Sequence, residues 1–414
     1  MASSLILLTL GLLLSLGFAA GHSAEKLGLP RVAIYVLVGV VFSESLLGGL
    51  LPGDPRAWDP VLVDASLGGI AFLIGGEVRP SRLKTLGRTF AGGLAGQTLG
   101  ALLLVTGALW GWQALVSPPP DASVALVLAA IATATAPAAT LAVIEQYRCS
   151  GPLTATLLYI VAVDDALAIV LFSLAVALAG GTGFQESMLQ AGWEIAGSLI
   201  VGAALGGLLG WFGRRVRDVD LRLPAILGTV LLAVGLAGLI ELSALLTCMV
   251  LGLVAKEIYG PEKTTQWLAS LRHIQEVLFL ILFTLAGTHF EPQVFSSAFG
   301  FILVYLVART AGKFAGAWLG VRAAKGNALV RRYLGVSLLP QAGVSIGLAL
   351  LALDVPDLEG SAELILNTVL GTTILFELTA PLLMRGALRR AGEIGTANEP
   401  PSSRPPPATA SRDR

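Results

Sequence analysis

Long apolar runs dominate the chain and fix its structural class. A helix needs about 20 apolar residues to cross the hydrocarbon core of a bilayer. Only 13% of the residues are charged, about half the share of a soluble domain. The sequence therefore predicts an all-α polytopic membrane protein with about 13 transmembrane helices. The apolar runs lie at about 3–20, 29–50, 61–78, 88–112, 122–147, 152–178, 188–213, 221–240, 242–258, 267–288, 295–321, 328–353 and 361–388.

The basic residues provide a test of that count, because cytoplasmic loops of membrane proteins are enriched in Lys and Arg. We assign the odd-numbered connections and the C-terminus to the cytoplasm. All but three of the 27 Lys and Arg residues then fall on that side. Arg56 lies on the other side, and Arg309 and Lys313 lie inside a run. We therefore expect the N-terminus outside, the C-terminus in the cytoplasm, and a place in the inner (plasma) membrane.

The first apolar run has two interpretations. Its short length and its Ala-rich end are also typical of a cleaved signal peptide. A signal peptide has Lys or Arg before its apolar stretch, however, and none precedes this one. We therefore treat the run as the first span.

Two triplets of runs, over 88–178 and 295–388, share a pattern. The middle run of each has a proline near its centre, set among small or polar residues. Proline removes a backbone donor and clashes with the preceding turn, so both helices should be interrupted in mid-membrane. The triplets start on opposite sides, which predicts an inverted repeat with two broken, crossing helices, the arrangement around a transporter's ion site. The two proline segments are Thr133-Ala-Thr135-Ala-Pro137 and Ser337-Leu-Leu-Pro340-Gln341-Ala-Gly343.

Two adjacent carboxylates, Asp164 and Asp165, lie well inside the apolar run 152–178. Each charged side chain at such depth costs about 2.5–3.5 kcal/mol of insertion free energy, which packing does not explain. Neighbours on a helix point about 100° apart, so the two acids can serve different partners. Charges this close also couple their titrations. The pair is thus a candidate site for cations and protons.

Two basic residues lie in the run 295–321. Arg309 and Lys313 are four residues apart and so share one helix face. A buried Lys can release its proton, whereas Arg stays charged. We therefore predict that Lys313 is the switchable partner of an aspartate and that Arg309 is a structural charge. The candidate acidic partners of Arg309 are Glu77, Glu145 and Glu276.

These features together resemble the monovalent cation/proton antiporter superfamily, specifically its second, bacterial branch with paired aspartates. The similarity covers about 3–390. It implies that Asp165 binds the cation, with Asp164 beside it, and that Asp164 pairs with Lys313. Thr135 is implied to line the site. Two further candidates for lining the site are Thr133 and Gln341.

The resemblance also implies a division of labour between parts of the chain. The two triplets form a core transport domain that moves against a scaffold through which the protein forms a homodimer. The tail is rich in Pro, Ser and Arg and is predicted to be a disordered cytoplasmic segment. The expected boundaries are 1–87 and 221–294 for the scaffold, 88–178 and 295–390 for the core, 179–220 for a linking helix, and 391–414 for the tail.

The expected function is secondary antiport of Na⁺ (or Li⁺) against H⁺ by alternating access, without a cofactor, and electrogenic. A K⁺/H⁺ antiporter stays open, because selectivity depends on cavity size and ligand number. An intramembrane aspartyl protease is a third hypothesis, but such enzymes place their aspartates on separate helices. A membrane sensor would need an appended signalling domain. The expected partners are the cation, the proton, the bilayer and a second copy of the chain; the balanced charge gives no sign of nucleic acid.

Overall fold

The structure is a computed structural model that describes residues 2–26, 31–51, 59–77, 87–115, 122–179, 184–215, 218, 220–259, 261–341 and 343–395. These residues form helices and the turns between them. In chain order the elements are α1 (Ala2–Lys26), α2 (Arg31–Val41), η1 (Gly48–Leu50), α3 (Asp59–Glu77), α5 (Gly87–Gln113), α6 (Ala122–Ile131), α7 (Pro137–Gln146), α8 (Pro152–Ala179), α9 (Phe184–Gly213), α10 (Arg222–Leu239), α11 (Ala244–Tyr259), α12 (Pro261–Thr288), α13 (Pro292–Ser297), α14 (Phe299–Ala323), α15 (Ala328–Ser337), α16 (Gly343–Leu351), η3 (Ala352–Asp354), η4 (Pro356–Leu358) and α17 (Ala362–Arg390).

Each predicted apolar run coincides with a helix or a pair of helices, which confirms the all-α membrane class. Seven described helices are long and apolar enough to cross a membrane, and five further apolar helices are shorter. The count of thirteen spans stays a prediction. The run 29–50 is only partly helical, because α2 ends before a polar stretch in which the Ser43 carbonyl accepts turn hydrogen bonds from Leu46 and Gly48.

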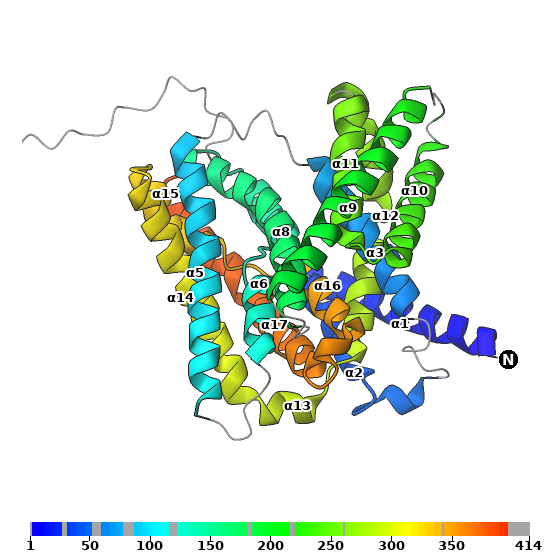
Figure 1. The fold of residues 1–414 in the computed structure, drawn as a ribbon, viewed down its shortest axis with the longest axis horizontal. Coiled ribbons are helices and arrows are strands. Elements are labelled where there is room, and N and C mark those ends of the chain that lie inside the picture. Colours follow the sequence, from blue (N-terminus) through cyan, green and yellow to red (C-terminus); the bar gives the residue numbers. More distant parts are fainter. Residues whose placement is uncertain are drawn as a thin grey trace, which may run out of the picture.

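The helices pack as two groups (Figure 1). The core group contains α5 to α8 and α14 to α17, and the scaffold group contains α1 to α3 and α9 to α12. Within the core group the closest neighbours are α5 and α14. Within the scaffold group α11 packs against both α9 and α3. The groups meet where α8 contacts α9 and α11, where α16 contacts α3 and α12, and where α17 contacts α2.

Six glycines bring α5 and α14 into backbone contact. They form three facing pairs, and the order of the pairs shows that the helices are antiparallel. A methyl carbon added to any of the six would meet a backbone carbonyl oxygen of the other helix. Small residues of this kind let membrane helices approach closely. Since α5 and α14 begin the two triplets, their opposite directions confirm the inverted repeat. The pairs are Gly92 with Gly320, Gly96 with Gly316, and Gly100 with Gly312.

A second glycine stripe joins α9 to α11. Gly202, Gly206 and Gly210 recur every four residues along α9, and a methyl carbon at each would collide with α11. Their neighbours include the carbonyl oxygens of Thr247 and Leu251. The stripe is therefore used for packing within the chain, and the helix that we predicted as a link contacts α11 and α10 of the scaffold group and α8 of the core group.

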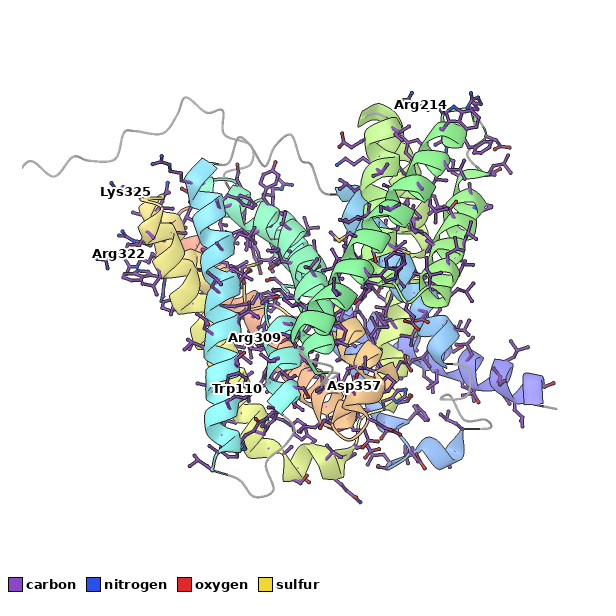
Figure 2. All side chains as sticks on the ribbon, viewed as in Figure 1. Trp110, Arg214, Arg309, Arg322, Lys325 and Asp357 are labelled. Carbon is purple, nitrogen blue, oxygen red and sulfur yellow. The ribbon has the colours of Figure 1, made fainter. Side chains whose placement is uncertain are left out.

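Basic residues from different connections lie toward the same end of the molecule. Figure 2 shows Arg214, Arg322 and Lys325 toward one end, and Trp110 and Asp357 toward the other. Arg214, Arg322 and Lys325 are among the basic residues that we assigned to the cytoplasm, and the three lie toward the same end, as that assignment requires.

The C-terminus of α17 folds back into the core group. Gly392 has φ +72°, in the left-handed region that favours glycine at the end of a helix. The Glu393 amide donates to the Leu388 carbonyl at 3.1 Å, which closes the turn. The predicted disordered tail therefore starts too early: residues 391–395 are folded, because this glycine turn directs them onto the core. The remainder of the predicted tail lies outside the described residues.

That turn carries a buried carboxylate to the start of α8. Glu393 is 1% exposed. Its carboxylate accepts from the Leu153 amide at 2.8 Å, and from the Thr154 amide and hydroxyl at 2.7 Å each. An acidic side chain at this position satisfies free amides of the first helical turn and interacts favourably with the helix dipole. The end of α17 is thereby joined to the beginning of α8.

We predict that Gly96→Ala lowers the stability of the core group. The new methyl group would meet the Gly316 carbonyl, and overpacking of this kind typically costs about 1–3 kcal/mol. Gly107→Ala is the matched control, because a methyl carbon at Gly107 on the same helix meets nothing within 4 Å. The measurement is the thermal unfolding midpoint in detergent. Equal midpoints for the two variants would contradict close packing at Gly96.

Candidate ion site

The two broken helices meet at their breaks. In the first, α6 ends at Ile131 and α7 starts at Pro137; in the second, α15 ends at Ser337 and α16 starts at Gly343. Pro137 suits a first helical position, where a missing N–H costs nothing. The Ala136 amide donates to the Pro340 carbonyl at 3.0 Å, so the non-helical segments are bonded directly to each other. The predicted mid-membrane breaks are confirmed.

Arg309 joins the two breaks. Its guanidinium is fully buried and donates to the Ala134 carbonyl and to the Leu339 carbonyl, each at 2.9 Å. It also lies 4.6 Å from the ring centre of Phe376 on α17. The free carbonyls at the end of a helix carry partial negative charge, which a cation stabilises. Arg309 thus stabilises the carbonyl ends of both broken helices at once.

Of the three candidate acidic partners of Arg309, the structure describes the side chain of Glu276 alone. Arg309 donates to carbonyls, which offer partial negative charge without an acidic residue. Glu276 lies elsewhere, with its carboxylate 3.3 Å from Arg31 and accepting from the Tyr35 hydroxyl at 2.5 Å. The side chains of Glu77 and Glu145 lie outside the described residues.

Lys313 lies one turn further along α14 and is also fully buried. Its Nζ donates to the Thr133 carbonyl at 2.8 Å, to the Ala134 carbonyl at 3.0 Å and to the Thr135 hydroxyl at 2.6 Å. The Asp164 carboxylate is 3.9 Å away. The Lys313 ammonium thus directs its donors into the first break. Its side chain does not extend to the membrane surface.

Thr135 connects Lys313 to Asp164. Its hydroxyl accepts from the Lys313 ammonium and donates to Asp164 Oδ2 at 2.5 Å. Both of these hydrogen bonds are shorter than the direct distance of 3.9 Å between the Lys313 ammonium and the Asp164 carboxylate. The structure brings these three predicted site residues together in one hydrogen-bonded chain.

Asp165 is held differently from its neighbour. Its side chain is 1% exposed, and its Oδ2 has no hydrogen-bond partner among the described residues. Asp164 is fully buried, with Oδ2 bonded to Thr135 and Oδ1 without a partner. The two adjacent acids therefore have different partners: Asp164 belongs to the Thr135–Lys313 chain and Asp165 does not, and each keeps one oxygen without a hydrogen-bond partner among the described residues.

The two further candidates for lining the site lie in the breaks and are also buried. The Thr133 hydroxyl donates to the Ala130 carbonyl at 2.7 Å, so Thr133 offers the site its carbonyl instead. The Gln341 amide donates to the Tyr305 hydroxyl at 3.3 Å, which leaves its Oε1 without a partner.

The sequence analysis missed one buried acid. Glu377 in α17 is 2% exposed, and its Oε1 has no hydrogen-bond partner among the described residues. The signal was a carboxylate inside an apolar run, between Phe376 and Leu378. A single acid without a neighbour is a weaker pattern than the pair in α8.

Comparison with known proteins gives consistent matches over most of the chain. The family described as "Sodium/hydrogen exchanger, transmembrane" matches residues 11–386. The ammonium/H⁺ antiporter subunit AmhT of Alkalihalophilus pseudofirmus is 26% identical over 284 residues, which are 67% of this chain and 69% of that protein.

Solved structures match the fold. A structure of the sodium/proton antiporter MjNhaP1 from Methanocaldococcus jannaschii at pH 8 superimposes with a TM-score of 0.74 and 19% identity, covering 95% of this chain and 99% of that one. A structure of MjNhaP1 from an electron microscopy map gives a TM-score of 0.71 at 19% identity, covering 93% and 97% of the two chains.

We predict that Lys313→Met destabilises the protein by about 3 kcal/mol or more. The substitution leaves the break carbonyls and the Asp164 carboxylate without their cation, and removing one partner of a buried charge pair has costs of this size. Arg389→Met, at an exposed position in the last turn of α17, is the control and should unfold like the wild type. Thermal unfolding in detergent compares them. A Lys313→Met protein as stable as the control would mean that the ammonium does not hold the break.

Proposed function

Since the chain belongs to the transmembrane sodium/hydrogen exchanger family, it is a multi-pass membrane transporter that exchanges a cation for protons, and we propose that its cation is Na⁺ (or Li⁺) and that the exchange is electrogenic. As a transporter it is not an enzyme, so the protease hypothesis is wrong. The proposal further places the protein in the inner membrane, with the N-terminus outside and the C-terminus in the cytoplasm.

The observation that supports the site assignment is that Asp165 lies outside the Thr135–Lys313 chain that engages Asp164, and that its Oδ2 has no hydrogen-bond partner among the described residues. A buried carboxylate without a protein cation is costly, and a bound cation or a proton removes that cost. Lys313 is engaged with the first break and Asp164, and Arg309 with both breaks. We therefore assign competition between Na⁺ and H⁺ to Asp165. Antiport follows, because a single carboxylate can carry either ion but not both.

Asp164 has a different role in this proposal. It is bonded to Thr135 and lies 3.9 Å from Lys313. When a cation occupies Asp165, the adjacent Asp164 is drawn toward it and its pairing with Lys313 weakens. Lys313 or Asp164 then exchanges a second proton. Two protons against one monovalent cation move a net charge across the membrane.

Alternating access requires the site to face one side at a time. We propose that the core group moves against the scaffold group, which also forms the homodimer contact. In support, the six-glycine contact binds α5 to α14 within the core, whereas α8, α16 and α17 carry the contacts to the scaffold. The ion site lies entirely on core elements, so its side chains would travel with that group.

K⁺ is the second candidate cation, since the same site residues do not discriminate by charge. NH₄⁺ joins it as a candidate because the relative AmhT is named as a subunit of an ammonium/H⁺ antiporter. Competition of each cation with ²²Na⁺ uptake into proteoliposomes ranks them. Proteoliposomes containing Asp165→Asn provide the blank for passive entry of ammonia.

We predict that Asp165→Asn abolishes exchange while the protein still folds. A neutral amide neither exchanges protons nor offers a full charge to a dehydrated cation. The measurement is dequenching of a pH-sensitive dye on addition of Na⁺, Li⁺ or K⁺ to proteoliposomes. Asp357→Asn, at an exposed acid outside the site, is the control and should leave the signal at the wild-type level. Wild-type exchange by Asp165→Asn would refute the assignment.

We predict that an inside-negative membrane potential drives Na⁺ extrusion without a pH gradient. Each elementary charge that crosses the membrane gains about 2.3 kcal/mol per 100 mV. A potassium-diffusion potential, set with valinomycin in sodium-loaded proteoliposomes, supplies the driving force, once K⁺ is shown not to be transported. Sodium flux that ignores the potential would indicate electroneutral exchange, with Asp164 and Lys313 as a static pair.

A further inference from the structure

Glu377 lies at the centre of α17 and takes no part in the ion site described above. It is 2% exposed, and its Oε1 has no hydrogen-bond partner in the part of the chain that the structure describes. One turn earlier, the hydroxyl of Thr373 is also buried and without a partner. Ionisable residues are rare in membrane spans because they cost about 2.5–3.5 kcal/mol each at the centre, and those present usually serve transport.

The depth of Glu377 matches that of the ion site. Its neighbour Phe376 lies beneath the Arg309 guanidinium, which bridges the two breaks. Phe376 also packs in one apolar cluster with Leu339, a residue of the second break. The carboxyl group is therefore level with the crossing of the broken helices. It belongs to the core group, like the aspartates.

The inverted repeat relates the position of Glu377 to that of the two aspartates. The helix α8 is the third element of the first triplet, and α17 is the third element of the second. Asp164 and Asp165 lie near the middle of α8 (Pro152–Ala179), and Glu377 lies near the middle of α17 (Ala362–Arg390). Both third helices thus carry acid at mid-membrane.

The elements that pack against α17 bring few ionisable groups to its centre. The helices α6, α13 and α16 contain no Asp, Glu, Lys, Arg or His. From α14, Arg309 reaches Phe376 and Tyr305 bonds to Gln341, whereas Lys313 is directed at the first break. Glu145 of α7 has a side chain outside the described residues. The remaining ionisable side chains on packed elements are Arg31 and Tyr35 on α2, both bonded to Glu276, Arg322 in the last turn of α14, Arg331, Arg332 and Tyr333 on α15, and Asp354 on η3.

We propose that Glu377 is an additional proton-binding group of the transport cycle, beyond the aspartate pair. In one conformation of the transport cycle, the carboxyl group is neutral and keeps its proton in the apolar core. When movement of the core group admits water, its O–H bond breaks, the proton passes to water, and a carboxylate is left behind. Rebinding reverses the step. This inference rests on the proposed function.

The test counts protons released when Na⁺ binds to purified protein. Calorimetry in two buffers of different ionisation enthalpy gives that number at each pH. We expect Glu377→Gln to bind Na⁺, because Asp165 is intact, and to release up to one proton fewer per cation than the wild type. Glu377→Asp, which keeps an acid, should retain the release. Glu363→Gln, at an exposed acid on the same helix, is the matched control. Proton release unchanged in Glu377→Gln at every pH would overturn the proposal.

A second measurement needs no cation and separates this inference from the proposed function. Infrared difference spectra between acid and alkaline pH detect the C=O band of a protonated buried carboxyl. In Asp164→Asn/Asp165→Asn such a band should remain; it should be lost on adding Glu377→Gln and shifted on adding Glu377→Asp. No remaining band, or one that both Glu377 changes leave intact, counts against Glu377. Sodium binding that survives Asp165→Asn counts instead against the assigned cation site.

Discussion

The contact between two buried cations and the carbonyl ends of two broken helices holds this protein together at mid-membrane. A helix interrupted inside a bilayer leaves backbone groups that water cannot reach, and each unsatisfied group costs several kcal/mol. Arg309 and Lys313, one turn apart on α14, meet those carbonyls. Because Lys313 also reaches Thr135 and lies near Asp164, the same ammonium serves both the backbone and the ion site. In the proposed mechanism, folding and ion binding are therefore coupled at that group.

The glycine contact explains how α14 comes to lie there. Without side chains between them, α5 and α14 are in direct backbone contact over three glycine pairs. Arg309 and Lys313 each lie three residues before a glycine of this contact, so they lie beside it on the same side of α14. Since α5 comes from the first triplet and α14 from the second, the contact also fastens the two repeats to each other. If the core group changes its orientation in the membrane, this contact keeps the geometry within the group unchanged.

Local chemistry explains which parts of this arrangement the sequence predicts. Pro137 and Pro340 interrupt helices by their own covalent structure, and charges such as Asp164 and Lys313 stand out against apolar surroundings. The partners of Arg309 could not be predicted, because Ala134 and Leu339 contribute only carbonyls, which every residue carries. Glu393 was assigned to the disordered tail, because its buried position depends on contacts with the start of α8, far earlier in the chain. Composition does not indicate contacts between residues that lie far apart in the sequence.

The hydrogen bonds of Glu393 connect the end of α17 to the helix that carries the two aspartates of the candidate ion site. Its carboxylate is bonded at the first turn of α8, and Asp164 follows on the same rigid helix about a dozen residues later. A pull on the chain beyond residue 395 would therefore act on the helix that carries both aspartates, with no flexible joint between. Any protein fused or bound at that point would therefore act on transport at a distance from the ions themselves.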